Sequence, residues 1–564
     1  MVGKTSLTGP TSQLILSARS ALRASRFVER LWAKDYRLWK PDPAEISNRL
    51  GWLTVAGEMQ GQISSLVTFS KSARTRGIRD VVLLGMGGSS LGPEVLRATF
   101  GSAPRYPKLW VLDSTVPGWV RQVTKAIHPD KTLFIVASKS GSTIEVTSLL
   151  EYFWNATSRV CGNRTGEQFV AITDPSTSLE KLAAERQFWR IFTNPPDIGG
   201  RYSVLSYFGL VPAALLGIDL VRLLGRAEDM ARRCRRQDPL EDNPGVELGA
   251  TMSALAGAGR DKVTILSSPA VASFGLWAEQ LLAESTGKEG TGLIPVAEEP
   301  IAPILAYSDD RQFVYLRLKI DHNQRLDRMA ASLRRQGHPV MVLELRDRYD
   351  LGAEFFRWEW ATAVAGHLLG IHPFDQPNVQ ESKDNTNRVL ASIQKTGRFP
   401  KQALSTPAQA GKQLQRSCGT GTYVAILAYV TPSKKINRAI RALRSALITR
   451  HHVTTTTGYG PRYLHSTGQM HKGGPPSGLF VQLNERMDPD LEIPRKPFTF
   501  GTLAHAQAAG DIEALRAHHR VALSVPLGKD PVSTISLLVK HLSPSHATRS
   551  PSANRKSRRH PRKK

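Results

Sequence analysis

The sequence predicts an α/β protein built from doubly wound parallel sheets, and two observations support that fold class. Short runs of uninterrupted apolar residues recur along the 564-residue chain, and segments with helical periodicity separate them. Strands that are apolar on both faces belong to sheets that helices cover on both sides, and helical crossovers make such sheets parallel. A chain of this length, 41% hydrophobic and 22% charged, is expected to contain several globular domains.

The N-terminal half is predicted to hold a helical arm and one α/β domain. Residues 1–60 have an amphipathic helical pattern that Pro41 and Pro43 interrupt, so we expect a helical N-terminal arm there. The first α/β domain is placed at residues 61–235. Its predicted strands are VVLLGM (81–86), LWVLD (109–113), LFIVAS (133–138) and FVAITD (169–174).

The C-terminal half predicts a second α/β domain in two parts, at residues 236–400 and 401–530. A Gly-, Ser- and Thr-rich stretch at 396–421 separates the parts and is expected to be a long exposed connection. Residues 531–564 are predicted to be a basic disordered tail. The predicted strands of this half are KVTILSS (262–268), FVYLRL (313–318), VMVLEL (340–345), YVAILAY (423–429), GLFVQL (478–483) and VALSVPL (521–527).

The net charge of +27 favours anionic partners. Residues 546–564 carry eight Lys or Arg and no acid, and we expect nucleic acid to bind there only non-specifically. The longest apolar run, GLVPAALLGI at 209–218, is far shorter than the ~20 residues of a membrane span, and the N-terminus lacks a signal-peptide core. A cytoplasmic protein without membrane contact is therefore expected. Its three cysteines lack CxxC spacing, which argues against a disulfide framework or a zinc site.

A strand at 133–138 leads directly into the hydroxyl-rich turn SKSGST (138–143), which predicts a phosphate site. The hydroxyls of Ser138, Ser140 and Thr143, the ammonium of Lys139 and the free N–H groups of the following helix would converge on one anion. The pattern GxxxxGK[ST] of nucleotide-binding P-loops is absent here, so a small phosphate ester suits the turn as well as a polyphosphate does.

A second glycine turn, GMGGSS (85–90), follows the strand at 81–86 and has two interpretations. With Gly85, Gly87 and the acid Asp113 it partly matches a dinucleotide fingerprint. Alternatively, it faces the SKSGST turn and contributes Gly88 and Ser89 to a site for a small anionic ligand. We favour the second interpretation because the two turns repeat one phosphate-binding device. Further on, Gly199-Gly200 would bring Arg201 in on a tight turn, either as a surface residue or with its guanidinium over developing negative charge.

The segments GMGGSSLGP, SKSGST and GGRYSVLSYFG resemble, in order and spacing, motifs of the phosphoglucose isomerases. Two more segments extend the resemblance. WAEQLLAESTGKEG (277–290) is similar to the family's catalytic-glutamate helix and implies that role for Glu284, with Gln280 one turn earlier. FDQPNVQESK (374–383) implies a catalytic lysine at Lys383 and a substrate contact at Gln376. Asn378 and Gln380 depart from the Gly and Glu that are usual in this last motif.

The family's histidine normally lies between the glutamate and the lysine, yet no matching segment occurs there. YLHSTGQMHKGG (463–474) resembles the histidine segment far downstream and implies that role for His465, with His471 as the competitor. The order glutamate, lysine, histidine resembles the isomerase half of bifunctional transaldolase/phosphoglucose isomerases, without a transaldolase half. This resemblance implies two sugar-isomerase-type (SIS-like) domains, the second with a rearranged segment order.

The resemblance implies reversible isomerisation of glucose 6-phosphate and fructose 6-phosphate through ring opening and an enediol, without metal or redox cofactor. His465 and Lys383 would open the ring, Glu284 would move the proton between carbons, and Arg201 would stabilise the enediolate. A homodimer is also implied. Two alternatives stay open: another sugar-phosphate isomerase, such as one acting on mannose phosphate, and a non-catalytic sugar-phosphate sensor.

Overall fold

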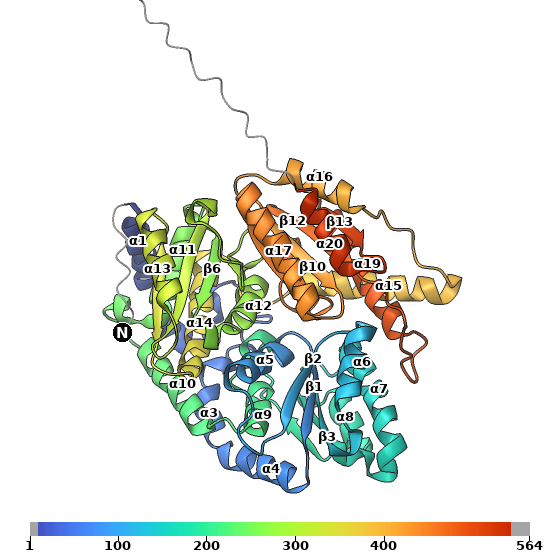
Figure 1. The fold of residues 1–564 in the computed structure, drawn as a ribbon. Coiled ribbons are helices and arrows are strands. Elements are labelled where there is room, and N and C mark those ends of the chain that lie inside the picture. The colour runs from blue at the N-terminus through green and yellow to red at the C-terminus, as the bar shows by residue number, and fades with distance from the viewer. Residues whose placement is uncertain (1–9, 543–564) are drawn as a thin grey trace, which may run out of the picture.

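In the computed structural model, which describes residues 10–542, the strands form three parallel sheets (Figure 1). The first sheet has the order β2-β1-β3-β4-β5. Every pairing in it is parallel, which confirms the α/β fold class. The strands are β1 (Asp80–Gly85), β2 (Lys108–Leu112), β3 (Thr132–Ala137), β4 (Phe169–Thr173) and β5 (Arg190–Thr193). The helices connecting or covering them are α4 (Ile63–Thr75), α5 (Gly88–Phe100), α6 (Pro117–Ala126), α7 (Ile144–Cys161), α8 (Ser178–Glu185) and α9 (Tyr207–Leu216).

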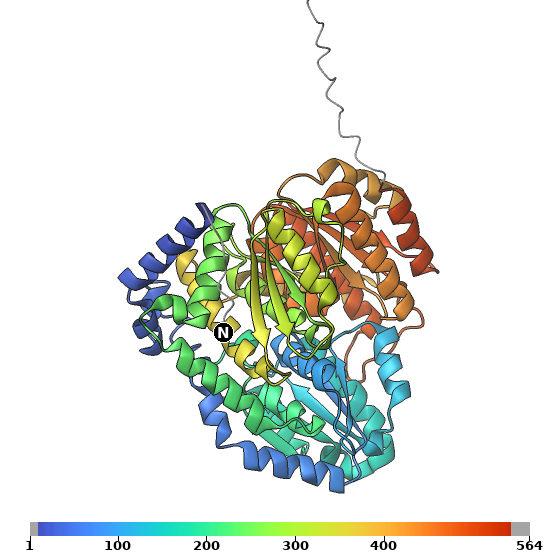
Figure 2. The same ribbon diagram turned by 60° about the vertical axis from the view of Figure 1, so that its left-hand side comes forward.

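The second predicted domain contains two sheets instead of one. The second sheet has the order β7-β6-β8-β9, and the third has the order β11-β10-β12-β13. Figure 2 shows the two sheets side by side. The second sheet comprises β6 (Lys262–Ser267), β7 (Ile294–Val296), β8 (Arg311–Leu318) and β9 (Val340–Leu345), with helices α10 (Leu220–Cys234), α11 (Pro244–Gly257), α12 (Phe274–Thr286), α13 (Gln324–Arg335) and α14 (Asp350–Leu368).

The third sheet is reached through helix α15, which runs beside its helix α19. The strands are β10 (Tyr423–Tyr429), β11 (Thr454–Tyr459), β12 (Gly478–Asn484) and β13 (Val521–Pro526). The helices are α15 (Pro377–Thr396), α16 (Pro407–Ser417), α17 (Lys434–His451), α18 (Gly468–Gly473), α19 (Phe500–Ala517) and α20 (Pro531–Lys540). Strands β5, β7 and β11 were not predicted, because β5 and β7 are short and β11 is Thr-rich, so none of them is a long apolar run.

Polar groups separate the facing edges of the second and third sheets. The backbone N–H of Thr455 in β11 donates to the Glu299 carboxylate at 2.8 Å instead of to a neighbouring strand. The buried Arg444 guanidinium donates to the carbonyls of Thr455 at 2.8 Å and Ala297 at 3.1 Å. Because side chains occupy the backbone groups that β7 and β11 could have exchanged, the eight strands do not merge into one sheet.

The predicted N-terminal arm is helical and belongs to the core. Its helices are α1 (Pro10–Ala24), α2 (Phe27–Trp32) and α3 (Val55–Gln60). Phe27, Leu31 and Trp52 are fully buried in the cluster that also contains α14. The Trp39 indole N–H donates to the Ala363 carbonyl of α14 at 2.9 Å. These contacts fix the arm against the second sheet.

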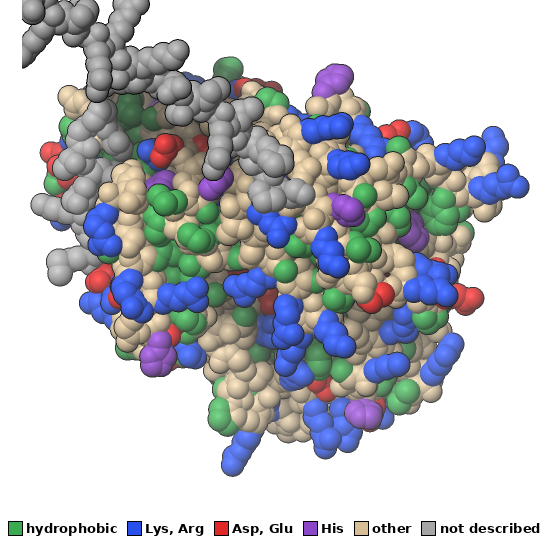
Figure 3. Space-filling model, turned by 45° about the horizontal axis from the view of Figure 1, so that its top comes forward, with side chains coloured by type: hydrophobic (Ala, Val, Ile, Leu, Met, Phe, Trp, Pro, Cys, Tyr) green, Lys and Arg blue, Asp and Glu red, His purple; other side chains and the backbone are tan. Residues whose placement is uncertain are grey.

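Two predicted segments need correction. The connection expected at 396–421 contains helix α16, which begins with a capping box between Thr406 and Gln409 and packs against α20. The predicted tail starts too early, because residues 531–540 form α20, where Asp530 caps the first turn and Leu538 is buried. The Lys- and Arg-rich residues 546–564 lie outside the described range. Figure 3 shows one face of the molecule, over which Lys and Arg are widely spread and Asp and Glu are sparse.

Candidate functional site

The hydroxyl-rich turn lies where the sequence predicts it, between β3 and α7. The Ser138 hydroxyl lies 3.0 Å from that of Thr143 and accepts the N–H of Gly141 at 3.1 Å. Thr143 is the N-cap residue of α7 but its side chain does not cap the helix, so the first N–H groups of α7 can bind an anion. The Ser140 hydroxyl lies 3.2 Å from that of Ser142 at the exposed rim of the turn.

The Lys139 side chain departs from the prediction. Its ammonium pairs with the Asp174 carboxylate, which follows β4, and donates to the Pro196 carbonyl at 3.0 Å. These partners turn the charge toward the neighbouring loops, and a ligand in the turn would meet the backbone N–H of Lys139 instead. Lys139 therefore ties the turn to β4.

The glycine turn after β1 touches two other segments of the site. Gly87 has a φ of 54°, and a Cβ there would lie 2.4 Å from the His465 carbonyl oxygen and 2.9 Å from the Gln280 amide nitrogen. A Cβ on Gly88 would lie 2.0 Å from the Gly200 carbonyl oxygen. Both positions need glycine because backbone from elsewhere in the chain approaches closely. The next residue, Ser89, is buried.

The dinucleotide interpretation of this turn fails on Asp113. Its carboxylate is completely buried, accepts the Ser90 hydroxyl at 3.0 Å and lies 3.7 Å from the Arg462 guanidinium. Burial raises its pKa, which the Arg462 charge partly offsets. A ribose hydroxyl could not reach an acid in this position.

Arg201 is a buried guanidinium that connects three parts of the site. Its side chain is 2% exposed and donates to the Ser285 hydroxyl at 2.7 Å and the Gln376 amide oxygen at 2.9 Å. It lies 3.3 Å from the Glu284 carboxylate. Its remaining donors reach the carbonyls of Pro373 and Asp375 at 2.8 and 2.9 Å. Such a fixed, buried positive charge is suited to stabilising a developing oxyanion near Glu284.

Glu284 and Gln280 share one face of helix α12 in the site. The Gln280 amide nitrogen donates to the Glu284 carboxylate at 2.9 Å and to the His465 carbonyl at 2.8 Å. The Glu284 side chain is 11% exposed, so its carboxylate is close to fully enclosed. This amide joins the proposed base on the second sheet to the histidine segment of the third sheet.

His465 comes into the site from the loop after β11. Its Nε2 lies 2.8 Å from the carboxylate of Glu145, which is in the first turn of α7. The same carboxylate oxygen accepts the Gln507 amide at 2.7 Å, and the Gln507 amide oxygen accepts the Thr115 hydroxyl at 2.8 Å. The competitor His471 is buried between the rings of Tyr463 and Phe480, where desolvation holds its pKa well below the usual value.

Sequence reasoning missed Glu145, although its position next to the SKSGST turn was a usable signal. Burial raises the pKa of the Glu145 carboxyl, but the charge of His465 and its hydrogen bond outweigh burial, and the pKa lies below the usual value. The charge of Lys383 lowers it further. Lys383 is an exposed residue of α15, and its charge therefore acts on the pair formed by His465 and Glu145.

Asn378, where the sequence departs from the family motif, is hydrogen-bonded to Gln469. Its backbone N–H donates to the Gln469 amide oxygen at 2.9 Å, and its side-chain oxygen accepts the Gln469 amide nitrogen at 2.7 Å. Gln469 belongs to the histidine segment, so the start of α15 is bound to that segment. The other departure, Gln380, donates to Asp384 at 2.8 Å on the exposed side of the helix.

Lys288 is a second residue that the sequence did not reveal. It is buried one turn after Glu284, and its ammonium donates to the carbonyls of His372 at 2.5 Å and Asp375 at 2.6 Å and pairs with the Asp375 carboxylate. Burial, and next the Arg201 charge, lower the pKa of Lys288 to about 7. It holds the segment 372–376, whose carbonyls in turn hold Arg201.

The site offers no metal ligands in the part of the chain that the structure describes: residues 10–542 contain no group of three or more His, Cys, Asp or Glu placed to hold a metal ion. Nor is any helix in that range long and apolar enough to cross a membrane. The arrangement offers an anion-binding turn, an enclosed carboxylate with a guanidinium, and a histidine paired with a carboxylate.

Comparison with known proteins identifies the family. A family model described as phosphoglucose isomerase matches residues 55–304. The glucose-6-phosphate isomerase of Rubrobacter xylanophilus is 30% identical over 365 residues, which cover 56% of this chain and 83% of that protein. The chain belongs to the phosphoglucose isomerase family. It is an enzyme of the glucose-6-phosphate isomerase family, as the motifs of the sequence predicted.

Other relatives agree with this membership. The glucose-6-phosphate isomerase of Carboxydothermus hydrogenoformans is 28% identical over 365 residues, 55% of this chain and 78% of that protein. Among solved structures, a glucose-6-phosphate isomerase from Chlamydia trachomatis shares the fold with a TM-score of 0.57 at 18% identity, over 68% of this chain and 87% of that chain. A hypothetical protein from Thermus thermophilus has a TM-score of 0.55 at 25% identity, over 67% of this chain and 95% of that chain. The SIS-like phosphosugar-isomerase fold is thereby confirmed.

Proposed function

We propose that the chain interconverts glucose 6-phosphate and fructose 6-phosphate through ring opening and an enediol. The observation that carries this proposal is the Gln280 amide, which bonds to both the Glu284 carboxylate and the His465 carbonyl. This amide holds the proposed base, Glu284, and the proposed ring-opening residue, His465, beside the glycine turn that neighbours the phosphate site. The proposed reaction needs the base, the ring-opening acid and the phosphate site within the length of one sugar.

The phosphate end of the sugar is the binding handle. In this proposal the hydroxyls of Ser138, Ser140 and Thr143 and the first N–H groups of α7 hold the phosphate. Gly88, Ser89 and Gln376 would contact the sugar. Binding energy gained at the phosphate then positions the reacting carbons against Glu284.

Ring opening is assigned to His465 and Lys383. The C1–O5 bond breaks, O5 gains a proton and the C1 hydroxyl loses one. His465 as an imidazolium is the donor to O5, because the buried Glu145 carboxylate beside it stabilises a positive ring. The proton of the C1 hydroxyl passes to solvent beside the exposed Lys383, whose charge acts on the same carboxylate from the α15 side.

Isomerisation is assigned to Glu284 and Arg201. Glu284 removes the proton from C2 of the open aldose and returns it to C1, while a proton passes from O2 to O1. The negative charge of the enediolate oxygen develops near the Arg201 guanidinium, whose orientation five other contacts fix. No net electron leaves or enters the sugar.

The test is Glu284→Gln, which keeps shape and removes the base. We expect turnover of fructose 6-phosphate, measured by coupled formation of glucose 6-phosphate, to fall by a factor of about 10² or more with KM changed little. Glu279→Gln is the matched control on the same helix. Burial raises the pKa of Glu279 to about 8, so its carboxyl is mostly neutral at pH 7 and glutamine replaces it closely.

Wild-type turnover in Glu284→Gln would contradict the base assignment. The same assay with mannose 6-phosphate separates the proposed specificity from that of another sugar-phosphate isomerase. A purified protein that binds the sugars and converts none of them would be a sensor. Family membership also implies a homodimer, which light scattering of the purified chain checks.

A further inference from the structure

The three sheets of this chain share one winding order. In each of them, the first strand along the chain is central, the second lies on one side, and the third and fourth follow on the other side: β2-β1-β3-β4, β7-β6-β8-β9 and β11-β10-β12-β13. The direction of winding therefore reverses between the first and third strands of each sheet. At such a reversal, the loops that follow the two neighbouring strands leave the sheet in opposite directions. This opens a crevice at the carboxyl ends of those strands, and ligands of α/β proteins bind in such crevices.

In the first sheet this crevice lies between β1 and β3. The glycine turn with Gly87 follows β1, and the turn with Ser138 follows β3, so the proposed phosphate site occupies the reversal point of that sheet. The corresponding point of the third sheet lies between β10 and β12. The residues that follow those strands are Thr431 and the segment 485–488.

A pocket of about 450 Å³ is present at this point of the third sheet. Its size falls within the range of small-molecule sites. The loops after all three of β10, β12 and β13 line it, as does the start of α6 from the first sheet. The lining residues are Gly118, Arg121, Thr431, Glu485, Arg486, Met487, Asp488, Gly528, Lys529 and Pro531.

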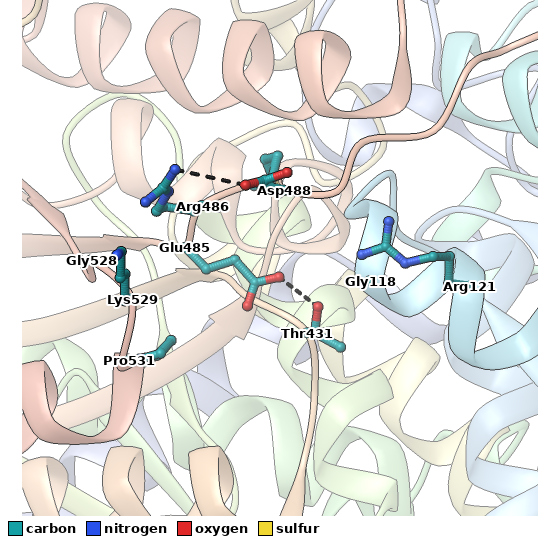
Figure 4. A pocket seen from close by; sticks show the side chains of 10 residues that line it. Gly118, Arg121, Thr431, Glu485, Arg486, Asp488, Gly528, Lys529 and Pro531 are labelled. Carbon is teal, nitrogen blue, oxygen red and sulfur yellow. Dashed lines mark hydrogen bonds and ion pairs between the residues drawn. The ribbon is translucent and has the colours of Figure 1, made fainter.

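Cations of this pocket come from both sides (Figure 4). Arg121 extends from α6 on one side and donates to the Pro489 carbonyl through one guanidinium nitrogen, while Arg486 and Lys529 belong to the third sheet on the other. In the described part of the chain, Lys529 makes no hydrogen bond or ion pair. Arg486 is 58% exposed, and among residues 10–542 its one ionic partner is Asp488 at 3.7 Å, a loose contact that a ligand could replace.

The acids of the pocket suit hydroxyl groups. Glu485 accepts the Thr431 hydroxyl at 2.5 Å through one oxygen, which leaves the other facing the pocket. Burial raises the pKa of Glu485, and hydrogen bonds from Thr431 and then the Arg121 charge oppose that rise. Helix α20 does not supply free N–H groups, since the Asp530 carboxylate already caps its first turn. An anion here would be bound by cationic side chains. The pocket has three of them and two carboxylates, so the cations are in excess.

We propose that this pocket at the reversal point of the third sheet binds a second phosphorylated polyhydroxy compound, separate from the catalytic site. Arg121, Arg486 and Lys529 hold the phosphate, and Glu485 accepts from a hydroxyl of the ligand. The site is built from the same sheet position as the catalytic phosphate site but with cationic side chains in place of serine hydroxyls and helix N–H groups. Its ligand bridges α6 and the third sheet.

Glucitol 6-phosphate is a suitable probe because it carries phosphate and hydroxyls but no carbonyl, so that isomerisation cannot consume it. Equilibrium dialysis of the full chain should give two bound molecules per chain. The double variant Arg486→Ala/Lys529→Ala should lose one of them, or weaken it at least about tenfold, and keep the wild-type isomerase rate. Ser138→Ala/Thr143→Ala should lose the other.

The double variant Arg325→Ala/Arg328→Ala is the matched control, because it removes the same charge from exposed positions on α13 of the second sheet. It should retain both bound molecules. One molecule per chain in the wild type that Arg486→Ala/Lys529→Ala does not affect would overturn the proposal, and so would equal weakening by the control. A single site that only Arg486→Ala/Lys529→Ala removes would support this pocket and count against the catalytic phosphate site instead.

Discussion

The pairing of His465 with Glu145 gives a prediction about one step of the reaction. Glu145→Gln removes a buried negative charge 2.8 Å from the His465 ring nitrogen and leaves the packing nearly unchanged. Hydrogen bonds between charged groups contribute about 1.5–3 kcal/mol. The imidazolium that donates to the ring oxygen should become less stable by that amount, which corresponds to about 10- to 100-fold slower ring opening.

Two substrates separate this step from the proton transfer that we propose for Glu284. Glucose 6-phosphate must be opened first, whereas an analogue without the 4- and 5-hydroxyls cannot close a five- or six-membered ring. We expect kcat for glucose 6-phosphate to fall about 10- to 100-fold in Glu145→Gln. Solvent deuterium exchange into the analogue, followed by NMR, should fall less than about threefold, because it needs only Glu284 and Arg201.

Equal losses on the two substrates would refute the ring-opening role of the pair. Glu151→Gln is the control: Glu151 is on the same helix and binds Arg186 at 2.6 Å, away from His465. It should keep the wild-type rates on both substrates. A drop there would mean that any change of charge in α7 disturbs the site.

Two further predictions concern groups that hold the site together. Gly87→Ala should lower kcat more than about tenfold, because its Cβ would overlap the His465 carbonyl. Gly162→Ala is the control, since Gly162 has a similar φ of 57° and nothing within 4 Å of the added Cβ. Backbone strain should lower its thermal unfolding temperature while its activity stays normal. Lys288→Met tests how the stability of the protein depends on pH through this side chain. The pKa of Lys288 is about 7 in the folded chain, below its unfolded value, so above pH 7 the unfolded chain binds one more proton than the folded chain does. The free energy of unfolding of the wild type should therefore rise relative to Lys288→Met by about 1.4 kcal/mol per pH unit between pH 7.5 and 9.5, measured by urea denaturation, and a flat difference would contradict the lowered pKa of Lys288.

Most of the fold was predictable because the central strands are continuous apolar runs. All ten predicted strands are present, and β10 is buried along its whole length. The edge strands β5, β7 and β11 were missed because short or Thr-rich strands at an edge lack that pattern. The division of the second domain into two sheets depends on contacts such as Glu299 with Thr455, which join residues 156 positions apart. No local pattern reports a contact of that kind.

The site was predictable where its residues lie in contiguous motifs. The turn at 138–143 was predicted from local sequence, and Arg201, Gln280 and Glu284 from the family resemblance. The structure places all of them at the carboxyl end of the first sheet. The pairing of the Lys139 ammonium with Asp174 was not expected, because Asp174 follows a different strand. Glu145 had a local signal that was not used.

The sequence alone determined the family, the parallel α/β class and the residue types of the proposed reaction, because apolar runs and glycine or serine turns act over a few neighbouring residues. Tertiary structure decided how a histidine far downstream reaches the site. Gln280 holds the His465 carbonyl, the Ser114 hydroxyl donates to the Gly460 carbonyl at 3.0 Å, and Glu145 receives the His465 ring. Each of these bonds joins segments at least 185 residues apart, and their geometry exists only after the three sheets have packed together.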